Sequence, residues 1–233
     1  MSVASILKKI PIFEDLTDED LAHLSECLIR RHFSKGQVVF HKGDEGGGLY
    51  IITQGKVKVV LPSQDGDEVI LSILTEGEII GELSLFDGHN RSASVGVLED
   101  TEFLYLSRND FMEFLSTRFH AVRRVLEMLT LRLRDTNDML EGAFFLDTTS
   151  RIAWKILVLG RQFGIYEDGI IRVGVRVTQS DLASMVGATR ESVNKQLKMF
   201  REHGMVTFEN GYFTILDPAR LARRARTSLG FFT

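Results

Sequence analysis

The chain has 233 residues, 44% hydrophobic and 26% charged, which is typical of a globular protein with one large or two modest domains. Its single cysteine, Cys27, excludes an internal disulfide, a thiolate zinc site and an iron–sulfur cluster, and we expect a buried thiol there. No apolar run reaches the ~18 residues of a membrane-spanning helix. The charges of Lys8, Lys9, Glu14 and Asp15 leave no room for a signal-peptide core. We therefore expect a soluble, cytoplasmic protein.

The net charge of −4 is unevenly distributed along the chain. Residues 1–143 hold 15 Lys and Arg against 24 Asp and Glu, a net charge of −9. Residues 144–233 hold 13 against 8, a net charge of +5. This asymmetry predicts an acidic first part joined to a part that meets an anionic partner.

The first half begins with a predicted helix and continues as a β-rich region. Residues 18–28 have apolar positions at helical spacing, and Thr17 with Asp20 resembles a capping box. Short β-rich runs separated by glycines follow from Ile29 to Ser107, which predicts a small sandwich or jelly roll. The runs are QVVFH, LYIIT, KVKVVL, EVILSIL and EFLYLS.

A long helix is predicted over residues 118–143, after a shorter helix capped by Ser107 with Asp110. One row of residues along this helix recurs at heptad spacing and forms a seam. Such a seam favours a partner helix, although a helix packed on its own domain would show the same pattern. Polar Thr136, next to Asn137, interrupts this seam, and polar groups there cost stability unless a partner satisfies them. The seam residues are Val122, Leu126, Leu129, Leu133, Thr136, Leu140 and Ala143.

The last ninety residues alternate helices and short strands. IAWKILVLGRQFG predicts an amphipathic helix that ends at Gly164, and IIRVGVRVT predicts a strand. Asn210-Gly211 lies between two β-rich runs and predicts a hairpin. An arginine-rich stretch closes the chain, for which packing, phosphate contact and plain solvation all remain open. Its arginines are Arg220, Arg223, Arg224 and Arg226.

A helix–turn–helix is predicted before the hairpin. Thr178 caps a short helix, Gly187 turns the chain, and Thr189 caps a longer helix that extends to about His203. In the second helix Val193, Leu197 and Phe200 share the core face, and polar residues suited to the major groove share the other. Those polar residues are Arg190, Glu191, Asn194, Lys195 and Lys198.

The stretch GELSLFDGHNRSASV, from Gly81 to Val95, has the composition of a small anion-binding pocket. It places one arginine, Arg91, beside glycine and small residues that expose backbone N–H groups.

The order of these parts resembles the CRP/FNR family of bacterial transcription regulators over nearly the whole chain. The most specific matches are GELSLF with RSA (81–86 and 91–93), FLDTTSRIA (145–153) and VGATRESVNKQL (186–197). The resemblance implies an α+β fold. Its parts are a cyclic-nucleotide-binding β-roll (1–117), a dimerisation helix (118–143) and a winged helix–turn–helix domain (144–233).

The resemblance further implies a pocket for a cyclic nucleotide, with cAMP as its allosteric ligand. A short helix beginning at Gly81 would direct free N–H groups at the phosphate. Arg91 would neutralise the cyclic phosphate, Ser92 and the Ala93 amide would add donors, and Glu82 would accept from the ribose 2′-hydroxyl. Thr136 and Asn137 would touch the base from both subunits, which explains the polar seam. The implied ligand-binding residues are Leu71, Ser72, Gly81, Glu82, Leu83, Ser84, Arg91, Ser92, Ala93, Arg132, Thr136 and Asn137.

The resemblance also implies contacts with double-stranded DNA at a pseudo-palindromic site whose half-sites contain G·C pairs like TGTGA. Lys195 stands where the family's enteric member has arginine, which would relax the preference at that base. The implied DNA-binding residues are Thr178, Gln179, Thr189, Arg190, Glu191, Ser192, Asn194, Lys195 and Lys198.

The expected function is therefore that of a homodimeric, cAMP-responsive transcription regulator that contacts RNA polymerase, has no enzymatic activity, holds no metal and does not bind a membrane. Asn137 leaves cGMP open, because asparagine can also donate to a guanine carbonyl. Two alternatives remain: a regulator that responds to cyclic di-GMP, and a ligand-independent DNA-binding regulator with a vestigial pocket.

Overall fold

The computed structural model describes residues 3–8, 10–14 and 16–226, and the chain forms two compact units, Met1–Asp135 and Thr136–Thr233. Lys9, Asp15 and the stretch after Arg226 lie outside the described residues. The boundary between the units falls within the long helix α5 (Phe119–Phe145). This helix was expected over 118–143, so it begins one residue later and ends two residues later than predicted.

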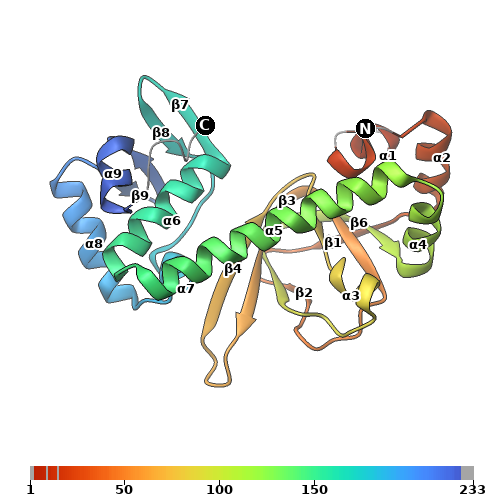
Figure 1. Cartoon of the computed structure of the whole chain (residues 1–233), viewed down its shortest axis with the longest axis horizontal. Helices are drawn as coiled ribbons and strands as arrows, with labels where there is room; N and C mark the ends of the chain where they lie inside the picture. Colours follow the sequence, from red (N-terminus) through yellow and green to blue (C-terminus); the bar gives the residue numbers. More distant parts are fainter. Residues whose placement is uncertain (1–2, 9, 15, 227–233) are drawn as a thin grey trace. The chain divides into compact units, whose positions relative to one another are not determined.

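The first unit is built on a six-stranded antiparallel sheet (Figure 1). Its main path runs in the order β1-β6-β3-β4, with β2 paired to β6 and β5 paired to β3. The described strands are β1 (Ile29–Phe33), β2 (Val38–Phe40), β3 (Gly48–Pro62), β4 (Glu68–Leu74), β5 (Ile79–Ile80) and β6 (Ser94–Ser107).

One strand replaces two predicted ones on either side of Gly55. The runs LYIIT and KVKVVL were expected as separate strands, but β3 continues through both. Gly55 has φ +100°, and a Cβ there would lie 2.4 Å from the Thr101 hydroxyl oxygen. The register against β6 shifts at this point, so the glycine marks a bulge rather than a turn.

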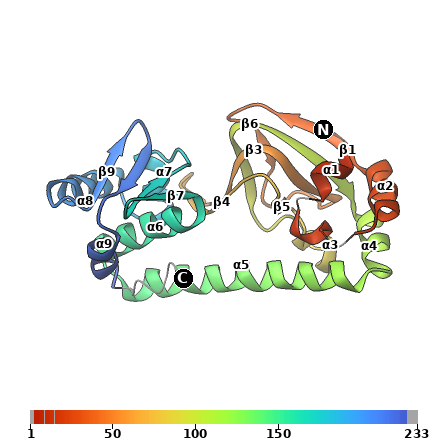
Figure 2. The same ribbon diagram turned by 90° about the horizontal axis from the view of Figure 1, so that it is seen from above.

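Short helices gather at one end of the roll, as Figure 2 shows for α1, α2 and α4. The capping box expected at Thr17 is present, since the Asp20 amide donates to the Thr17 hydroxyl (3.2 Å) and the Thr17 amide donates to the Asp20 carboxylate (3.3 Å). The cap expected at Ser107 is present too, since its hydroxyl accepts from the Asp110 amide (3.2 Å). The helices are α1 (Val3–Leu7), the 3-10 turn η1 (Pro11–Phe13), α2 (Asp18–Cys27), α3 (Leu83–Asp87) and α4 (Arg108–Ser116).

The N-terminal segment contributes to the core of the first unit, which its sequence did not predict. Leu7, Ile10 and Phe13 are at most 2% exposed and pack in one cluster with residues of α2, the sheet and α5. Cys27 packs against this cluster and is half-buried, so the thiol is less buried than expected. Partial burial still raises the pKa of the thiol.

The second unit packs helices against a four-stranded antiparallel sheet of order β7-β8-β10-β9. The predicted strand IIRVGVRVT is shorter than expected, since β8 ends at Val173. The Gly174 amide still donates to the Phe163 carbonyl (2.7 Å), in register with the pairing of β7 and β8. The elements are α6 (Thr148–Phe163), β7 (Gly164–Glu167), β8 (Ile170–Val173), α7 (Gln179–Val186), α8 (Arg190–Glu202), β9 (Val206–Glu209), β10 (Tyr212–Ile215) and α9 (Pro218–Arg224).

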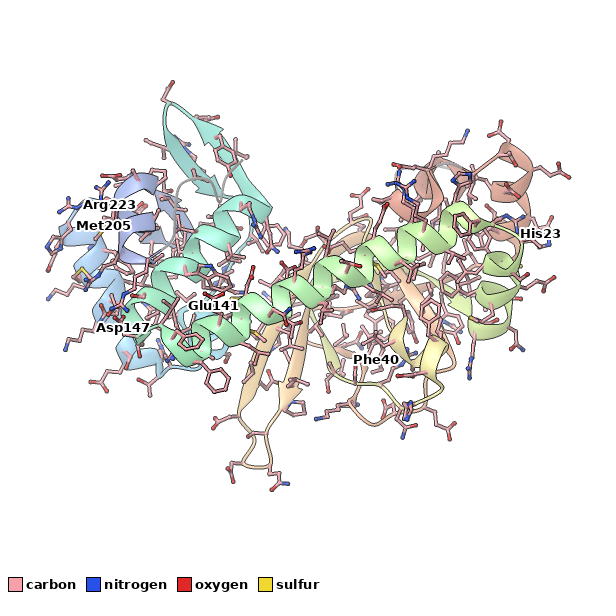
Figure 3. All side chains as sticks on the ribbon, viewed as in Figure 1. His23, Phe40, Glu141, Asp147, Met205 and Arg223 are labelled. Carbon is pink, nitrogen blue, oxygen red and sulfur yellow. The ribbon has the colours of Figure 1, made fainter. Side chains whose placement is uncertain are left out.

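The arginine-rich C-terminal stretch packs on its own unit as far as Arg226. Leu221 and Ala222 of α9 are at most 2% exposed, and α9 packs against α6. Arg226 binds Asp147, the residue that caps α6, with Nη2 3.2 Å from Oδ2. Figure 3 labels Asp147 and, on the same unit, Arg223. Of the three roles left open for this stretch, packing is the one that the described residues show.

Candidate functional site

Arg91 lies in a cradle of neutral acceptors in the first unit. It is 6% exposed and donates from Nη1 to the Gly81 carbonyl (2.5 Å) and the Ser84 hydroxyl (2.9 Å). Its Nη2 donates to the Gly48 carbonyl (2.6 Å). Burial lowers the pKa of the guanidinium, although arginine remains charged at any physiological pH.

The positive charge of Arg91 has no carboxylate bound to it among the described residues. Its Nε is buried there without a hydrogen-bond partner. A buried cation is costly unless an opposite charge compensates it. This environment is therefore suited to a small anion that reaches the guanidinium.

Glycine is required at position 81 for two independent reasons. Gly81 has φ +82°, a conformation that L side chains rarely adopt. A Cβ there would also lie 2.3 Å from Nη1 of Arg91. Because this backbone is not helical, α3 begins at Leu83 with Glu82 as its N-cap, and the expected helix start at Gly81 is wrong.

Glu82, the second charged group of the predicted pocket, is 3% exposed and forms an ion pair with Nη1 of Arg132. Arg132 also donates from Nη2 to the Ile79 carbonyl (2.5 Å). Arg132 projects from α5, so a residue fifty positions after Glu82 reaches residues 81–93, which we call the cassette. The structure thus brings together five of the residues predicted to bind the ligand, namely Gly81, Glu82, Ser84, Arg91 and Arg132.

The other predicted ligand residues are more dispersed. Ala93 is buried, whereas Ser92 is exposed and Leu83 is 45% exposed. Half-buried Leu71 and Ser72 lie on β4, where the register against β3 shifts beside them. Such a bulge redirects neighbouring side chains.

Thr136 and Asn137 are exposed on α5, one helical turn beyond Arg132. They fall in the second compact unit, and the described contacts of the Arg91 cradle do not include them. Their predicted contact with a ligand base stays a prediction.

Sequence reasoning missed Phe40, Gly46 and Gly48. The Arg91 guanidinium carbon lies 4.4 Å from the centre of the Phe40 ring. A Cβ on Gly46 would lie 2.1 Å from the Ser84 hydroxyl oxygen, so glycine there permits the approach of Ser84. The run of three glycines at 46–48 could have indicated that side chains approach the backbone closely there, but such a run is equally typical of a turn.

The helix–turn–helix of the second unit forms as predicted. Thr178 and Asp181 make a reciprocal capping box, and Gly187 ends α7 in the left-handed conformation (φ 60°). The Ser192 amide donates to the Thr189 hydroxyl at the start of α8 (3.1 Å). These local bonds fix where both helices begin.

α8 presents the two faces that its sequence predicted. Val193, Leu197 and Phe200 are at most 6% exposed and form the core face. The other face carries five exposed polar residues: Arg190, Glu191, Asn194, Lys195 and Lys198. Gln179, at the start of α7, reaches this face and donates to the Asn194 side chain (3.4 Å).

The hairpin after α8 also forms as predicted, with Asn210 (φ 54°) and Gly211 (φ 89°) in its turn. Positive φ at both central residues is the geometry of a type I′ turn. A second hairpin, β7–β8, was missed although Asp168-Gly169 carries the same signal, with φ 49° and 79°.

Two negative findings concern only the part of the chain that the structure describes. Within it, no group of three or more His, Cys, Asp or Glu side chains is placed to hold a metal ion. The described helices include none that is long and apolar enough to cross a membrane.

Comparison with known proteins agrees with both units. The family model described as Cyclic nucleotide-binding domain matches residues 30–118, and the Crp-like helix-turn-helix domain matches residues 150–224. The c-di-GMP responsive global regulator CLP of Xanthomonas campestris has a similar fold, with a TM-score of 0.73 at 23% identity. That match covers 86% of this chain and 99% of the other.

Two curated relatives match almost end to end. The CRP-like cAMP-activated global transcriptional regulator of Mycobacterium tuberculosis is 36% identical over 95% of this chain and 99% of its own length. The Cyclic AMP receptor protein of Thermus thermophilus is 31% identical over 92% of this chain and 96% of its own length. The chain therefore belongs to the CRP/FNR family, whose members are transcription regulators rather than enzymes.

Proposed function

We propose that this chain is a homodimeric transcription regulator that binds cAMP at the Arg91 cassette and DNA through α8. The observation that carries the proposal is the buried Arg91 guanidinium, which donates to neutral acceptors and has no carboxylate of the described residues bound to it, although Glu82 and Asp44 lie near enough to favour its charge. One singly charged phosphodiester would compensate this single positive charge. The backbone N–H groups in the first turn of α3 would add donors to the phosphate.

Glu82 supports a ribonucleotide, and the choice of cAMP among ribonucleotides rests on the relatives. Glu82 is buried beside the cradle, where its carboxylate would accept a hydrogen bond from a ribose 2′-hydroxyl. The names of the M. tuberculosis and T. thermophilus proteins refer to cAMP. Thr136 and Asn137 would meet the base at the dimer seam, and Leu71, Ser72, Ser92 and Ala93 would complete the pocket.

Dimerisation is supported by an exposed apolar stripe on α5, although Val122 and Leu129 of the predicted seam pack against the core of the first unit. Phe119, Leu126, Leu133 and Leu140 recur at intervals of seven residues and are 78%, 59%, 63% and 49% exposed. A second helix with the same repeat would cover this stripe in a coiled coil. A cyclic nucleotide at this seam would shift the balance between dimer conformations only through its different affinities for them.

DNA reading is supported by the polar face of α8. Arg190 would donate two hydrogen bonds to guanine O6 and N7, and Glu191 would accept from cytosine N4. Thr178, Gln179, Thr189, Ser192, Asn194, Lys195 and Lys198 would hold the phosphates or neighbouring bases. Two such helices on a two-fold axis would read half-sites about one helical turn apart. In the cytoplasm the bound dimer would then contact RNA polymerase.

The test is calorimetric titration of the nucleotide-stripped protein with 3′,5′-cAMP, cGMP and cyclic di-GMP. We expect micromolar cAMP binding at one nucleotide per chain. Binding of cyclic di-GMP or cGMP alone would contradict the choice of ligand. No binding of any of the three, together with unchanged specific DNA binding, would make the chain a ligand-independent regulator.

A further inference from the structure

Phe40 is the aromatic residue that contacts the Arg91 guanidinium directly. Its ring centre lies 4.4 Å from the guanidinium carbon, well within the distance of a cation–π interaction. Phe40 is the last residue of the short strand β2, which pairs with β6. In this pairing Phe40 lies opposite Val95, shortly after the cassette in the sequence. Figure 3 labels Phe40 in the first unit.

Further rings extend this contact away from Arg91. The Phe40 and Tyr50 ring centres are 6.0 Å apart, and those of Tyr50 and Tyr105 are 5.0 Å apart. Tyr105 approaches Gly48 so closely that a Cβ there would lie 2.5 Å from its phenol oxygen. Gly48 is the residue whose carbonyl accepts from Nη2 of Arg91. The rings therefore support the guanidinium both directly and through its acceptor.

From these contacts we infer that Phe40 is a positioning residue, which fixes the orientation of the Arg91 guanidinium toward the phosphate of a cyclic nucleotide. The inference rests on the proposed function, because it concerns the same ligand. The three acceptors of the cradle are neutral and constrain only Nη1 and Nη2. The ring face of Phe40 constrains the plane of the group and keeps its surroundings apolar. In such surroundings a charge acts more strongly on an anion than it does in water.

The experiment compares Phe40→Leu with Phe33→Leu. Both phenylalanines are half-buried and pack against the same hydrophobic cluster. Phe33 contacts Tyr50 and Phe103, at ring-centre distances of 6.4 and 5.6 Å, whereas the ring over the Arg91 guanidinium is that of Phe40. Phe33→Leu therefore reproduces the loss of an aromatic ring without the loss of the contact with the guanidinium.

The readout is the dissociation constant for 3′,5′-cAMP and for its Rp and Sp phosphorothioates. Each diastereomer replaces a different exocyclic phosphate oxygen with sulfur, so their affinity ratio reports how the guanidinium is aimed. We expect Phe40→Leu to weaken cAMP binding by about 3- to 30-fold, as the range of cation–π energies implies. We also expect it to bring the Rp/Sp ratio toward one, whereas Phe33→Leu keeps the ratio of the unchanged protein.

Two results would overturn the inference while leaving the proposed function in place. One is an unchanged cAMP affinity and Rp/Sp ratio in Phe40→Leu. The other is an equal loss for both diastereomers in both variants, which would mark a general effect on the fold. Failure of the unchanged protein to bind cAMP would instead overturn the proposed function, and this inference with it.

Discussion

Arg91 of the first unit is 6% exposed and bound to three fixed neutral acceptors, whereas Arg190 and Lys198 of the second unit lie on the open face of α8. The buried cation is held in one orientation and suits one small anion at one position. The exposed cations remain hydrated, and salt screens them. The same charge thus serves two kinds of recognition, and burial decides which.

Of the changes considered, a rise in salt concentration should affect the binding affinities of the two sites most differently. A protein that contacts six to ten DNA phosphates loses roughly 10³- to 10⁵-fold in affinity between about 50 and 200 mM salt, because released counterions drive that binding. Binding of a single nucleotide phosphate to buried Arg91 should change by less than about tenfold over the same range. Calorimetry for cAMP and fluorescence anisotropy for labelled DNA would measure both. Equal salt slopes would contradict the contrast between an exposed surface that binds many phosphates and a buried cation that binds one.

Arg91→Ala should remove nucleotide binding and leave general DNA affinity in place. Truncating one partner of a buried charge pair costs roughly 2–5 kcal/mol, so the affinity for cAMP should fall by at least about 30-fold. DNA binding should then no longer respond to cAMP. Lys195→Ala is the matched control, and it should weaken DNA binding while keeping the affinity for cAMP. A chain whose DNA binding ignores both cAMP and Arg91→Ala would have a vestigial pocket.

Arg190→Ala tests the other site with a smaller effect. Loss of a bidentate contact to guanine should cost about 1–3 kcal/mol of specific binding and relax the preference for that base. Competition between site variants that differ at one G·C pair would measure it. Arg201→Ala, an exposed arginine in the last turn of the same helix, should leave base preference unchanged. An unaltered preference in Arg190→Ala would remove this residue from the readout.

The two sites also differ in how far the sequence predicts them. The helix–turn–helix follows from signals within a few residues, such as Thr178 with Asp181, the left-handed Gly187 and the Asn210-Gly211 turn. Each of these signals acts through the local backbone conformation, so the chain nearby is sufficient to predict it. The polar and buried faces of α8 follow from the same helical periodicity.

The cradle of Arg91 depends instead on pairing between distant segments. Gly48 lies 43 residues before Arg91 and is brought close by the pairing of β3 with β6, and Phe40 arrives through the pairing of β2 with β6. The sequence identified Arg91 and Glu82 by type, but it could not show which carbonyls or rings would surround them. The misassigned break at Gly55 has the same origin, since only the opposing Thr101 distinguishes a bulge from a turn there.

The same contrast between buried and exposed charge can be tested at smaller scale within α2. Asp20 binds Arg118 through Nε (2.9 Å) and Nη2 (2.5 Å), and the two side chains are 25% and 24% exposed. The hydrogen bond from Arg118 lowers the pKa of Asp20 below its usual 3.8. Asp18 pairs with Lys8 at 2.7 Å, but its side chain is 90% exposed.

Because the pKa of Asp20 is lower in the folded state, its ion pair stabilises the protein above about pH 4, and this stabilisation is lost as pH falls through the folded pKa. Asp20→Asn keeps an oxygen acceptor for the capping box while removing the charge. At pH 7 it should lower the free energy of unfolding by about 1 kcal/mol, or Tm by a few degrees, and the difference from the unchanged protein should shrink below about pH 4. Asp18→Asn should leave Tm unchanged at either pH. If both variants lowered Tm equally, burial would not be what distinguishes these two ion pairs. Burial would then be no reason to expect a strong interaction of Arg91 with an anion.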